Sequence, residues 1–268
     1  MICFPNAKIN LGLHILSRRT DGYHNIETVF YPVNLCDALE IIPAGEGKVT
    51  LTQTGIPIGG KPENNLVMKA YHLLKKDYDL PGISIYLRKQ IPHGAGLGGG
   101  SSDAAFMIKL LNDFSGLKLN LEQMENYARQ IGADCPFFIQ NKPVFAEGTG
   151  SVFSPAKILL RGYYLVVVKP DISVSTQKAY AQVTPQQPAV PLKEIIRLPI
   201  NEWKNHLFND FEPGVFAQYP EIKEIKQRLY AEGAIYASMS GSGSAVFGIF
   251  EEAVKMEWDK KAVQLLIG

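Results

Sequence analysis

Alternating hydrophobic and polar residues predict β-strands in the first third of the chain. Ile83, Ile85 and Leu87 are each followed by a residue that tolerates exposure, which is the two-residue period of a strand with one buried face. Four earlier segments are rich in strand-forming residues and are separated by glycine, proline, asparagine or aspartate. These predicted strands cover residues 7–16, 27–31, 38–42 and 48–53.

A helical period follows at two places before residue 116. Asn65 can cap a helix in which Leu66, Ala70, Leu73 and Leu74 share one face. A second helix should continue through Leu111 and end at Ser115–Gly116, with Ser101 or Ser102 as its cap. Both predicted helices would place their apolar faces against the strands.

A third helix is predicted from its capping residues. Asn120 and Gln123 have the spacing of a capping box, in which each side chain bonds the other residue's backbone. Gly132 stands where a left-handed residue would end this helix. Asp134 therefore follows the helix in a turn.

The pattern of elements starts again after about residue 150. We expect a strand at 163–168, a polar loop at 184–191, a helix at 220–232, strands at 235–239 and 245–250, and a closing helix from about Glu252. The chain is thus predicted to be an α+β protein of two domains, residues 1–153 and 154–268.

Charge and composition exclude several classes of function. Lys and Arg number 27 against 26 Asp and Glu, so no overall basic field favours nucleic acid. The three cysteines are far apart and the five histidines lack metal-ligand spacing, so we expect no protein-built metal site. We find neither a signal peptide nor an apolar run long enough for a membrane helix, and we expect a cytoplasmic protein.

The sequence PHGAGLGGGSSDAA at residues 92–105 indicates an anion site. Five glycines lie between Gly94 and Gly100, after a predicted strand and before a predicted helix. Unpaired N–H groups of the first helical turn attract an anion, and glycines let phosphate oxygens approach the backbone. A tight turn or close packing of helix and strand is the alternative, although either needs fewer glycines.

Known phosphate-binding patterns fit this run poorly. Residues 94–99 satisfy G-x-G-x-x-G, but no acidic residue follows on a second strand as a dinucleotide site requires. The run does not end in Gly-Lys-Ser/Thr, which excludes the P-loop, and the chain lacks the HRD and DFG motifs of protein kinases.

The glycine run instead resembles the signature of the GHMP kinases, which are small-molecule kinases named for galactokinase, homoserine kinase, mevalonate kinase and phosphomevalonate kinase. PNAKINLGLHI, GADCPFF, FAEGTG and MSGSGSAVF resemble other signature regions of that superfamily, in the same order along the chain. The resemblance implies a two-domain GHMP-kinase fold with its active site in the inter-domain cleft.

The resemblance also implies ATP as phosphoryl donor, with Mg²⁺ bound to the nucleotide. Asn65 and Leu66 would line the adenine pocket, although a helix cap explains Asn65 equally well. Asp103 could be an acid of the first helical turn or a group near Mg²⁺, and we favour the first. The expected nucleotide-binding residues of the glycine run are Pro92, Gly94, Ala95, Gly96, Leu97, Gly98, Gly99, Gly100, Ser101 and Ser102.

The sequence RRTDGYHNIETVF, at residues 18–30, is similar to the segment with the pattern D-G-Y-H that one branch of the superfamily carries. Enzymes of this branch phosphorylate the 2-hydroxyl of 4-diphosphocytidyl-2-C-methyl-D-erythritol in the non-mevalonate route to isoprenoids. The resemblance implies that Tyr23 and His24 bind the cytosine. Tyr180 would supply a second stacking face, where relatives often carry Phe. The other expected substrate-binding residues are Asn10, Thr176, Gly241 and Ser242.

Lys8 and Asp134 are the expected catalytic pair. A carboxylate at Asp134 could accept the proton of the substrate hydroxyl or orient that hydroxyl, and the sequence leaves both roles open. Lys8 would keep the carboxylate ionised and offset charge on the transferred group. Spacing alone favours a surface turn for Asp134 and a solvated strand-end charge for Lys8, and the resemblance reverses that preference.

Two other interpretations stay open. The chain could be a different superfamily member such as a homoserine kinase, or an inactive protein that binds nucleotide as a regulator. We expect a small-molecule substrate as the partner, with no nucleic acid and no membrane, and a monomer or weak homodimer.

Overall fold

The computed structural model describes residues 1–45, 47–254 and 261–267, and it contains both helices and strands. Contacts divide the chain into two compact units, each built from separate stretches of sequence. The first unit comprises residues 1–7, 35–93 and 98–142, and the second comprises 8–34, 94–97 and 143–268. The chain passes between the units several times, so they are not divided at a single point near residue 153. That boundary stays a prediction for the two family domains.

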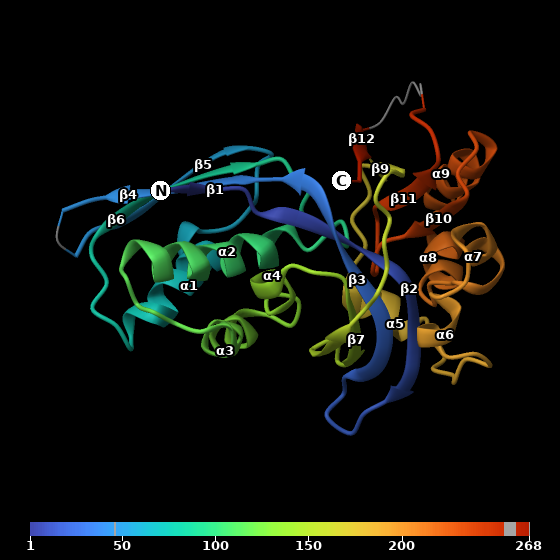
Figure 1. Ribbon diagram of the computed structural model, residues 1–268, viewed down its shortest axis with the longest axis horizontal. Coiled ribbons are helices and arrows are strands. Elements are labelled where there is room, and N and C mark those ends of the chain that lie inside the picture. Colours follow the sequence, from blue (N-terminus) through green and yellow to red (C-terminus); the bar gives the residue numbers. More distant parts are fainter. Residues whose placement is uncertain (46, 255–260, 268) are drawn as a thin grey trace. The chain divides into compact units, whose positions relative to one another are not determined.

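The first unit is a four-stranded sheet with helices on one side (Figure 1). The strand order is β1 (Ile2–Cys3), β4 (Ala38–Pro43), β6 (Ile83–Lys89) and β5 (Val49–Gly55). β4 is antiparallel to β1 and β6, whereas β5 runs parallel to β6. The helical elements are η1 (Pro62–Asn64), α1 (Leu66–Lys75), α2 (Gly99–Phe114), α3 (Leu121–Ile131) and α4 (Phe137–Gln140).

The predicted period of β6 is confirmed by burial. Ile83, Ile85 and Leu87 are at most 1% exposed and face the helices, while Tyr86 is 42% exposed. Burying one large apolar side chain stabilises the fold by about 1.5–3 kcal/mol, so this row of three fixes which face of the strand packs inward.

Local capping follows the sequence at α1 and α3 but not at α2. The Asn65 side chain accepts a hydrogen bond from Val67 N, and Asn120 and Gln123 form the expected capping box. The predicted caps of α2 were wrong: the cap is Gly98, and Ser101 and Ser102 lie inside the first turns of the helix.

Gly132 was also predicted wrongly. Its φ is −178°, so it is extended rather than left-handed. The chain leaves α3 straight into the turn that carries Asp134, without the reversal that a left-handed residue would give.

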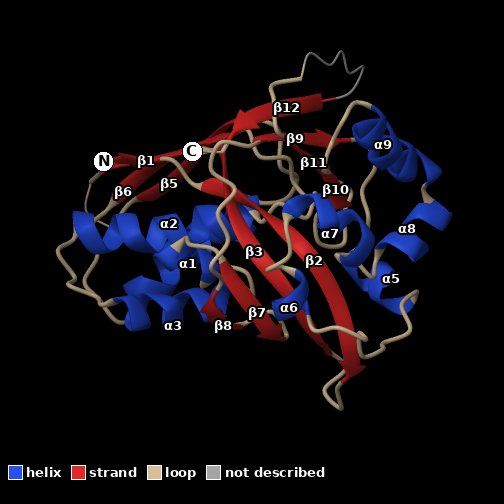
Figure 2. Cartoon of the chain, turned by 45° about the vertical axis from the view of Figure 1, so that its right-hand side comes forward, coloured by secondary structure: helices blue, strands red, loops and turns tan. Residues whose placement is uncertain are grey.

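The second unit contains two antiparallel sheets. In one, β2 (Asn6–Arg18) and β3 (His24–Cys36) form a long pair, followed by β7 (Val144–Gly148) and β8 (Val152–Pro155) (Figure 2). The other has the order β10 (Tyr236–Met239), β11 (Val246–Phe250), β9 (Tyr164–Lys169) and β12 (Lys261–Leu266). The helices are α5 (Thr176–Ala181), α6 (Leu192–Ile195), α7 (Ile200–His206), α8 (Glu212–Gln218) and α9 (Pro220–Ala231).

The core of the second unit joins residues that are far apart in the sequence. Leu13 and Ile15 of β2 belong to one buried cluster with Val166 of β9, and with Ile222 and Leu229 of α9. Residues 252–254, where the predicted closing helix would begin, are not helical, and residues 255–260 lie outside the described residues. The segment after them is β12, a strand that pairs with β9 rather than a helix.

Candidate active site

The glycine run changes conformation along its length. Gly94, Gly96 and Gly98 have φ values of 61°, 75° and 70°, in the left-handed region that glycine adopts without strain. A Cβ at Gly96 would lie 1.9 Å from the Ser240 carbonyl oxygen, and one at Gly99 would lie 2.7 Å from Ile91 Cγ2. At these two positions, therefore, the close approach that excludes a side chain is made by the protein itself and not by a phosphate.

Residues 94–97 are held by backbone hydrogen bonds within the second unit. Lys8 N donates to Leu97 O at 3.0 Å, and Ala245 N donates to Ala95 O at 3.1 Å. The loop is therefore fixed between the start of β2 and the segment before β11. Pro92 precedes this loop and is half-buried.

The N-terminus of α2 belongs to the first unit and begins as soon as the loop ends. The first N–H groups of a helix lack partners within it, and the aligned peptide dipoles make this end positive. The groups concerned are those of Gly99, Gly100 and Ser101. A Cβ at Gly100 would meet nothing nearer than Leu66 Cδ1 at 3.6 Å, so the backbone of Gly100 is open to approach.

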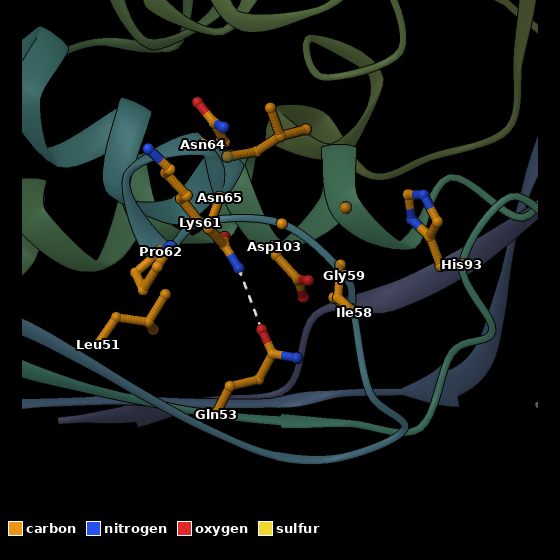
Figure 3. Close-up of a pocket in the computed structure, with 13 residues that line it drawn as sticks. Leu51, Gln53, Ile58, Gly59, Lys61, Pro62, Asn64, Asn65, His93 and Asp103 are labelled. Carbon is orange, nitrogen blue, oxygen red and sulfur yellow. Dashed lines mark hydrogen bonds between the residues drawn. The ribbon is translucent and has the colours of Figure 1, made fainter.

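A cavity of about 440 Å³ lies in the first unit beside this helix end (Figure 3). Asn65, Leu66 and Gly100, three of the residues expected to bind nucleotide, line it. Gln53 of β5 lines the same cavity, and its Oε1 accepts a hydrogen bond from Asn65 Nδ2 at 3.3 Å. Asn65 thus caps α1 and also presents its amide to the cavity. Sequence reasoning missed Gln53, because a polar residue on a strand is usually solvated.

Asp103 lines this cavity, and it lies beyond the first turn of α2, in which we expected it to lie. Its Oδ2 accepts a hydrogen bond from Lys89 Nζ at 2.6 Å, and Lys89 also pairs with the buried Asp37. Asp37 additionally accepts the backbone N–H groups of Gln90 and Ile91. Burial, which Lys89 partly offsets and the charge of Asp37 reinforces, raises the pKa of Asp103 to about 7.

Lys8 and Asn10 lie two residues apart on the same face of β2. Lys8 Nζ donates to Asn10 Oδ1 at 2.5 Å and lies 4.8 Å from the centroid of the Phe30 ring. Asn10 Nδ2 in turn donates to Thr28 Oγ1 at 3.0 Å, and Thr28 Oγ1 donates to Gly12 O. Because Lys8 is 3% exposed and Asn10 2%, this chain of hydrogen bonds fixes the direction of the ammonium group.

Ser240 and Asn209 support this arrangement, and sequence reasoning missed both. The Ser240 hydroxyl donates to Gly96 O at 2.8 Å and accepts from Asn10 N at 3.3 Å. Asn209 Nδ2 donates at 2.8 Å to both Met239 O and Gly241 O. The serine lay within a run already selected for its glycines, whereas nothing near Asn209 indicated a role.

Gly241, Ser242 and Thr176, three residues predicted to bind substrate, come together. Gly241 has a φ of 55°, and the Ser242 and Thr176 hydroxyl oxygens are 2.9 Å apart. Thr176 is the first residue of α5, so the SGSGS loop at residues 240–244 meets the start of this helix.

Tyr23, His24, Thr176 and Tyr180 line a second cavity, of about 640 Å³, in the second unit. The His24 and Tyr180 rings stack directly on each other, with centroids 4.8 Å apart and planes 15° apart. The resemblance implied that Tyr180 offers a stacking face to the base, and in the structure His24 covers one face of the Tyr180 ring. Tyr23 is 67% exposed and leaves its ring open to the cavity and solvent.

Asp134 lies half-buried in the turn between α3 and α4. The next residue, Cys135, is fully buried, and burial raises the pKa of its thiol to about 11. A thiol with this pKa stays protonated at neutral pH and packs as a small apolar group, which explains why cysteine fits here.

Neither a metal cluster nor a membrane span occurs in the described part of the chain. Among those residues, no three or more His, Cys, Asp or Glu side chains are grouped so that they could hold a metal ion. In the same ranges, no helix is both long and apolar enough to cross a membrane.

Comparison with known families defines the class. The family model for the GHMP kinases N terminal domain matches residues 65–142, and the model for the GHMP kinases C terminal domain matches residues 192–263. The first match includes the glycine run and Asp134, and the second includes the SGSGS loop. The fold is therefore that of a GHMP kinase.

Two curated relatives are similar over nearly the whole chain. A protein of Bacteroides fragilis named 4-diphosphocytidyl-2-C-methyl-D-erythritol kinase is 60% identical over 97% of this chain and 96% of its own length. A protein of the same name from Parabacteroides distasonis is 59% identical over 94% of this chain and 92% of its own. The chain therefore belongs to the 4-diphosphocytidyl-2-C-methyl-D-erythritol kinase family of the GHMP kinases.

Solved structures agree with this assignment. The crystal structure of a 4-(cytidine 5'-diphospho)-2C-methyl-D-erythritol kinase has a TM-score of 0.80 and 35% identity, and covers 93% of this chain and 90% of its own. A mevalonate kinase of Methanococcus jannaschii, 13% identical, has a TM-score of 0.68 over 100% of this chain and 98% of its own, and shows the shared fold alone.

Proposed function

We propose that this chain transfers the terminal phosphoryl group of ATP to the 2-hydroxyl of 4-diphosphocytidyl-2-C-methyl-D-erythritol, in the cytoplasm, as a step of the non-mevalonate route to isoprenoids. The observation that carries the proposal is the 60% identity to a named kinase over 97% of the chain. The cavity that gathers Tyr23, His24, Thr176 and Tyr180 supports a ligand with an aromatic base.

The nucleotide would use the first unit. The cavity lined by Asn65, Leu66 and Gln53 has a volume in the range of small-molecule sites and would take the adenine. The positive end of α2 and the left-handed glycines before it would take the phosphates. Mg²⁺, when bound with the nucleotide, would neutralise phosphate charge. Asp103 Oδ2 already pairs with Lys89, whereas its Oδ1 is buried without a hydrogen-bond partner among the described residues.

Lys8 and Asp134 would do the chemistry. Phosphoryl transfer depends on holding the groups in line and stabilising charge, and Lys8 Nζ, fixed by Asn10, is a preorganised cation. Asp134 would accept the proton of the 2-hydroxyl or orient that hydroxyl toward phosphorus. The oxygen would then form its bond to phosphorus as the bond to ADP breaks.

An acceptor assay tests the proposal. Purified protein with magnesium and ATP should release ADP rapidly with 4-diphosphocytidyl-2-C-methyl-D-erythritol and not with homoserine, mevalonate or no acceptor. Turnover of homoserine alone would select the other superfamily activity, and bound ATP without turnover of any acceptor would indicate a regulator.

The catalytic role of Asp134 needs a separate variant. Asp134→Ala should lower kcat by about a hundredfold to ten-thousandfold while ATP affinity changes little, because the carboxylate acts on the acceptor hydroxyl. Retained turnover in this variant would remove Asp134 from the mechanism.

A further inference from the structure

The cavity of the second unit has an uneven charge. Its lining is aromatic, hydroxyl-bearing or apolar apart from Arg18, the imidazole of His24 and the amide of Gln177. Among its described lining residues, Arg18 is the one lysine or arginine, and no carboxylate lines it. A ligand that carries negative charge therefore meets one fixed cation in this cavity.

Arg18 and Arg19 are adjacent in the sequence but differ in their contacts. The Arg19 guanidinium donates to both Asp21 carboxylate oxygens, at 2.8–3.2 Å, and to Asn25 Oδ1 at 3.3 Å. Asp21 Oδ1 also accepts from Tyr23 N at 3.1 Å. Arg19 is therefore used to close the turn that presents Tyr23 and His24.

Arg18 takes no part in that turn. It is the last residue of β2 and lines the cavity, whereas Arg19 lies beyond the strand and does not line it. Among the described residues no hydrogen bond or ion pair holds its exposed guanidinium. An arginine without an internal partner, in a cavity without carboxylates, keeps all its donors for a ligand.

We propose that Arg18 binds the diphosphate of the cytidylyl substrate and thereby makes the site select nucleoside diphosphates over nucleosides. This inference rests on the proposed function, because the proposed substrate carries a diphosphate linked to a base, which a simple alcohol substrate lacks. The planar guanidinium presents parallel N–H groups that match two phosphate oxygens, which a single ammonium cannot do. In this arrangement Arg18 recognises the charge of the diphosphate, and the aromatic residues recognise the base.

The test is a set of binding titrations with cytidine, CMP and CDP. They are measured by calorimetry while a non-hydrolysable ATP analogue saturates the nucleotide site, so that CDP cannot bind there. Arg18→Gln should leave the Kd of cytidine unchanged and weaken CDP by about tenfold, with CMP between them, because each phosphate adds contacts that depend on the guanidinium.

Arg161→Gln is the matched control, because it removes the same charge from an exposed position outside the cavity lining. It should change none of the three affinities. Arg18→Lys should recover part of the CDP affinity, since it restores charge without the planar fork.

The outcomes separate the two proposals. Unchanged CDP affinity in Arg18→Gln, or an equal loss for cytidine and CDP, would overturn the role of Arg18 while leaving the proposed function in place. If the wild-type protein bound none of the three ligands, the proposed substrate would fall and the role of Arg18 with it.

Discussion

Gly94 and Gly96 have similar backbone angles but different surroundings, which makes them a matched pair at the residue scale. Their φ values are 61° and 75°. A Cβ at Gly94 would meet Ser173 Oγ at 3.8 Å, an ordinary contact, whereas one at Gly96 would meet the Ser240 carbonyl at 1.9 Å. The first substitution adds backbone strain, and the second adds strain and a collision with a backbone atom.

We expect Gly94→Ala to cost about 1 kcal/mol of unfolding free energy and Gly96→Ala about 3 kcal/mol or more. Urea unfolding of the two variants measures the difference. Equal losses would show that the contact between Gly96 and Ser240 does not constrain the loop.

Asp103 should make stability depend on pH. Its pKa is about 7 in the folded chain, above the ordinary value of 3.8, because burial disfavours its charge. The folded state therefore holds a proton that the unfolded state releases between these values. The stabilisation of the folded state by this proton is fully present below about pH 4 and is lost as the pH rises through about 7.

Asp103→Asn keeps the shape of the side chain but cannot ionise. The free energy of unfolding of the wild type, relative to this variant, should fall as the pH rises from about 4 to above 7. Urea titrations at a series of pH values measure that difference. A difference that does not change with pH would show that Asp103 is ionised throughout, held by Lys89.

At the scale of elements, Asn209 ties the segment before α8 to the loop that carries Gly241 and Ser242. It bonds the carbonyls of Met239 and Gly241, and its own Oδ1 accepts from Phe211 N. Asn209→Ala would leave these buried groups without partners at a cost of about 2–3 kcal/mol. The exposed Asn205→Ala is the control and should stay within about 0.5 kcal/mol of wild type.

Thermal unfolding and the KM of the cytidylyl substrate together check this prediction. We expect the KM to rise in Asn209→Ala, because the Gly241 and Ser242 loop loses its anchor. A destabilised variant with normal KM would mean that the loop holds its position without Asn209.

The sequence predicted where strands and helices lie better than it predicted where helices begin and which distant residues come into contact. The strands around residues 7–16 and 83–87, and the caps Asn65 and Asn120, follow from local periodicity and local hydrogen bonds. The cap of α2 was misplaced because serine usually caps a helix, whereas here a left-handed Gly98 does so. The Lys89, Asp37 and Asp103 cluster could not be predicted, because it joins positions up to 66 residues apart that carry no common motif.

At the scale of the whole molecule, each unit depends on separated stretches of sequence. Leu13, Ile15 and Ile26 lie in the core of the second unit, together with residues of β9, β10, β11 and α9. A fragment of residues 1–153 would keep those three side chains and lose the strands and helix that bury them.

We therefore expect fragments 1–153 and 154–268 to fold poorly when expressed alone. Circular dichroism and hydrogen exchange of each fragment measure this, and co-expression of both is the control that restores the missing partners. A fragment 1–153 with protected amides in β2 would contradict the expectation.

The contact between Asn10 and Ser240 also has a consequence for synthesis. These residues are 230 positions apart, and both are buried in the finished chain. At the usual rate of about 5–20 residues per second, β2 leaves the ribosome more than about ten seconds before its last partners exist. During that interval the apolar side of β2 is exposed to the cell, so the newborn chain depends on chaperones most while it is still incomplete.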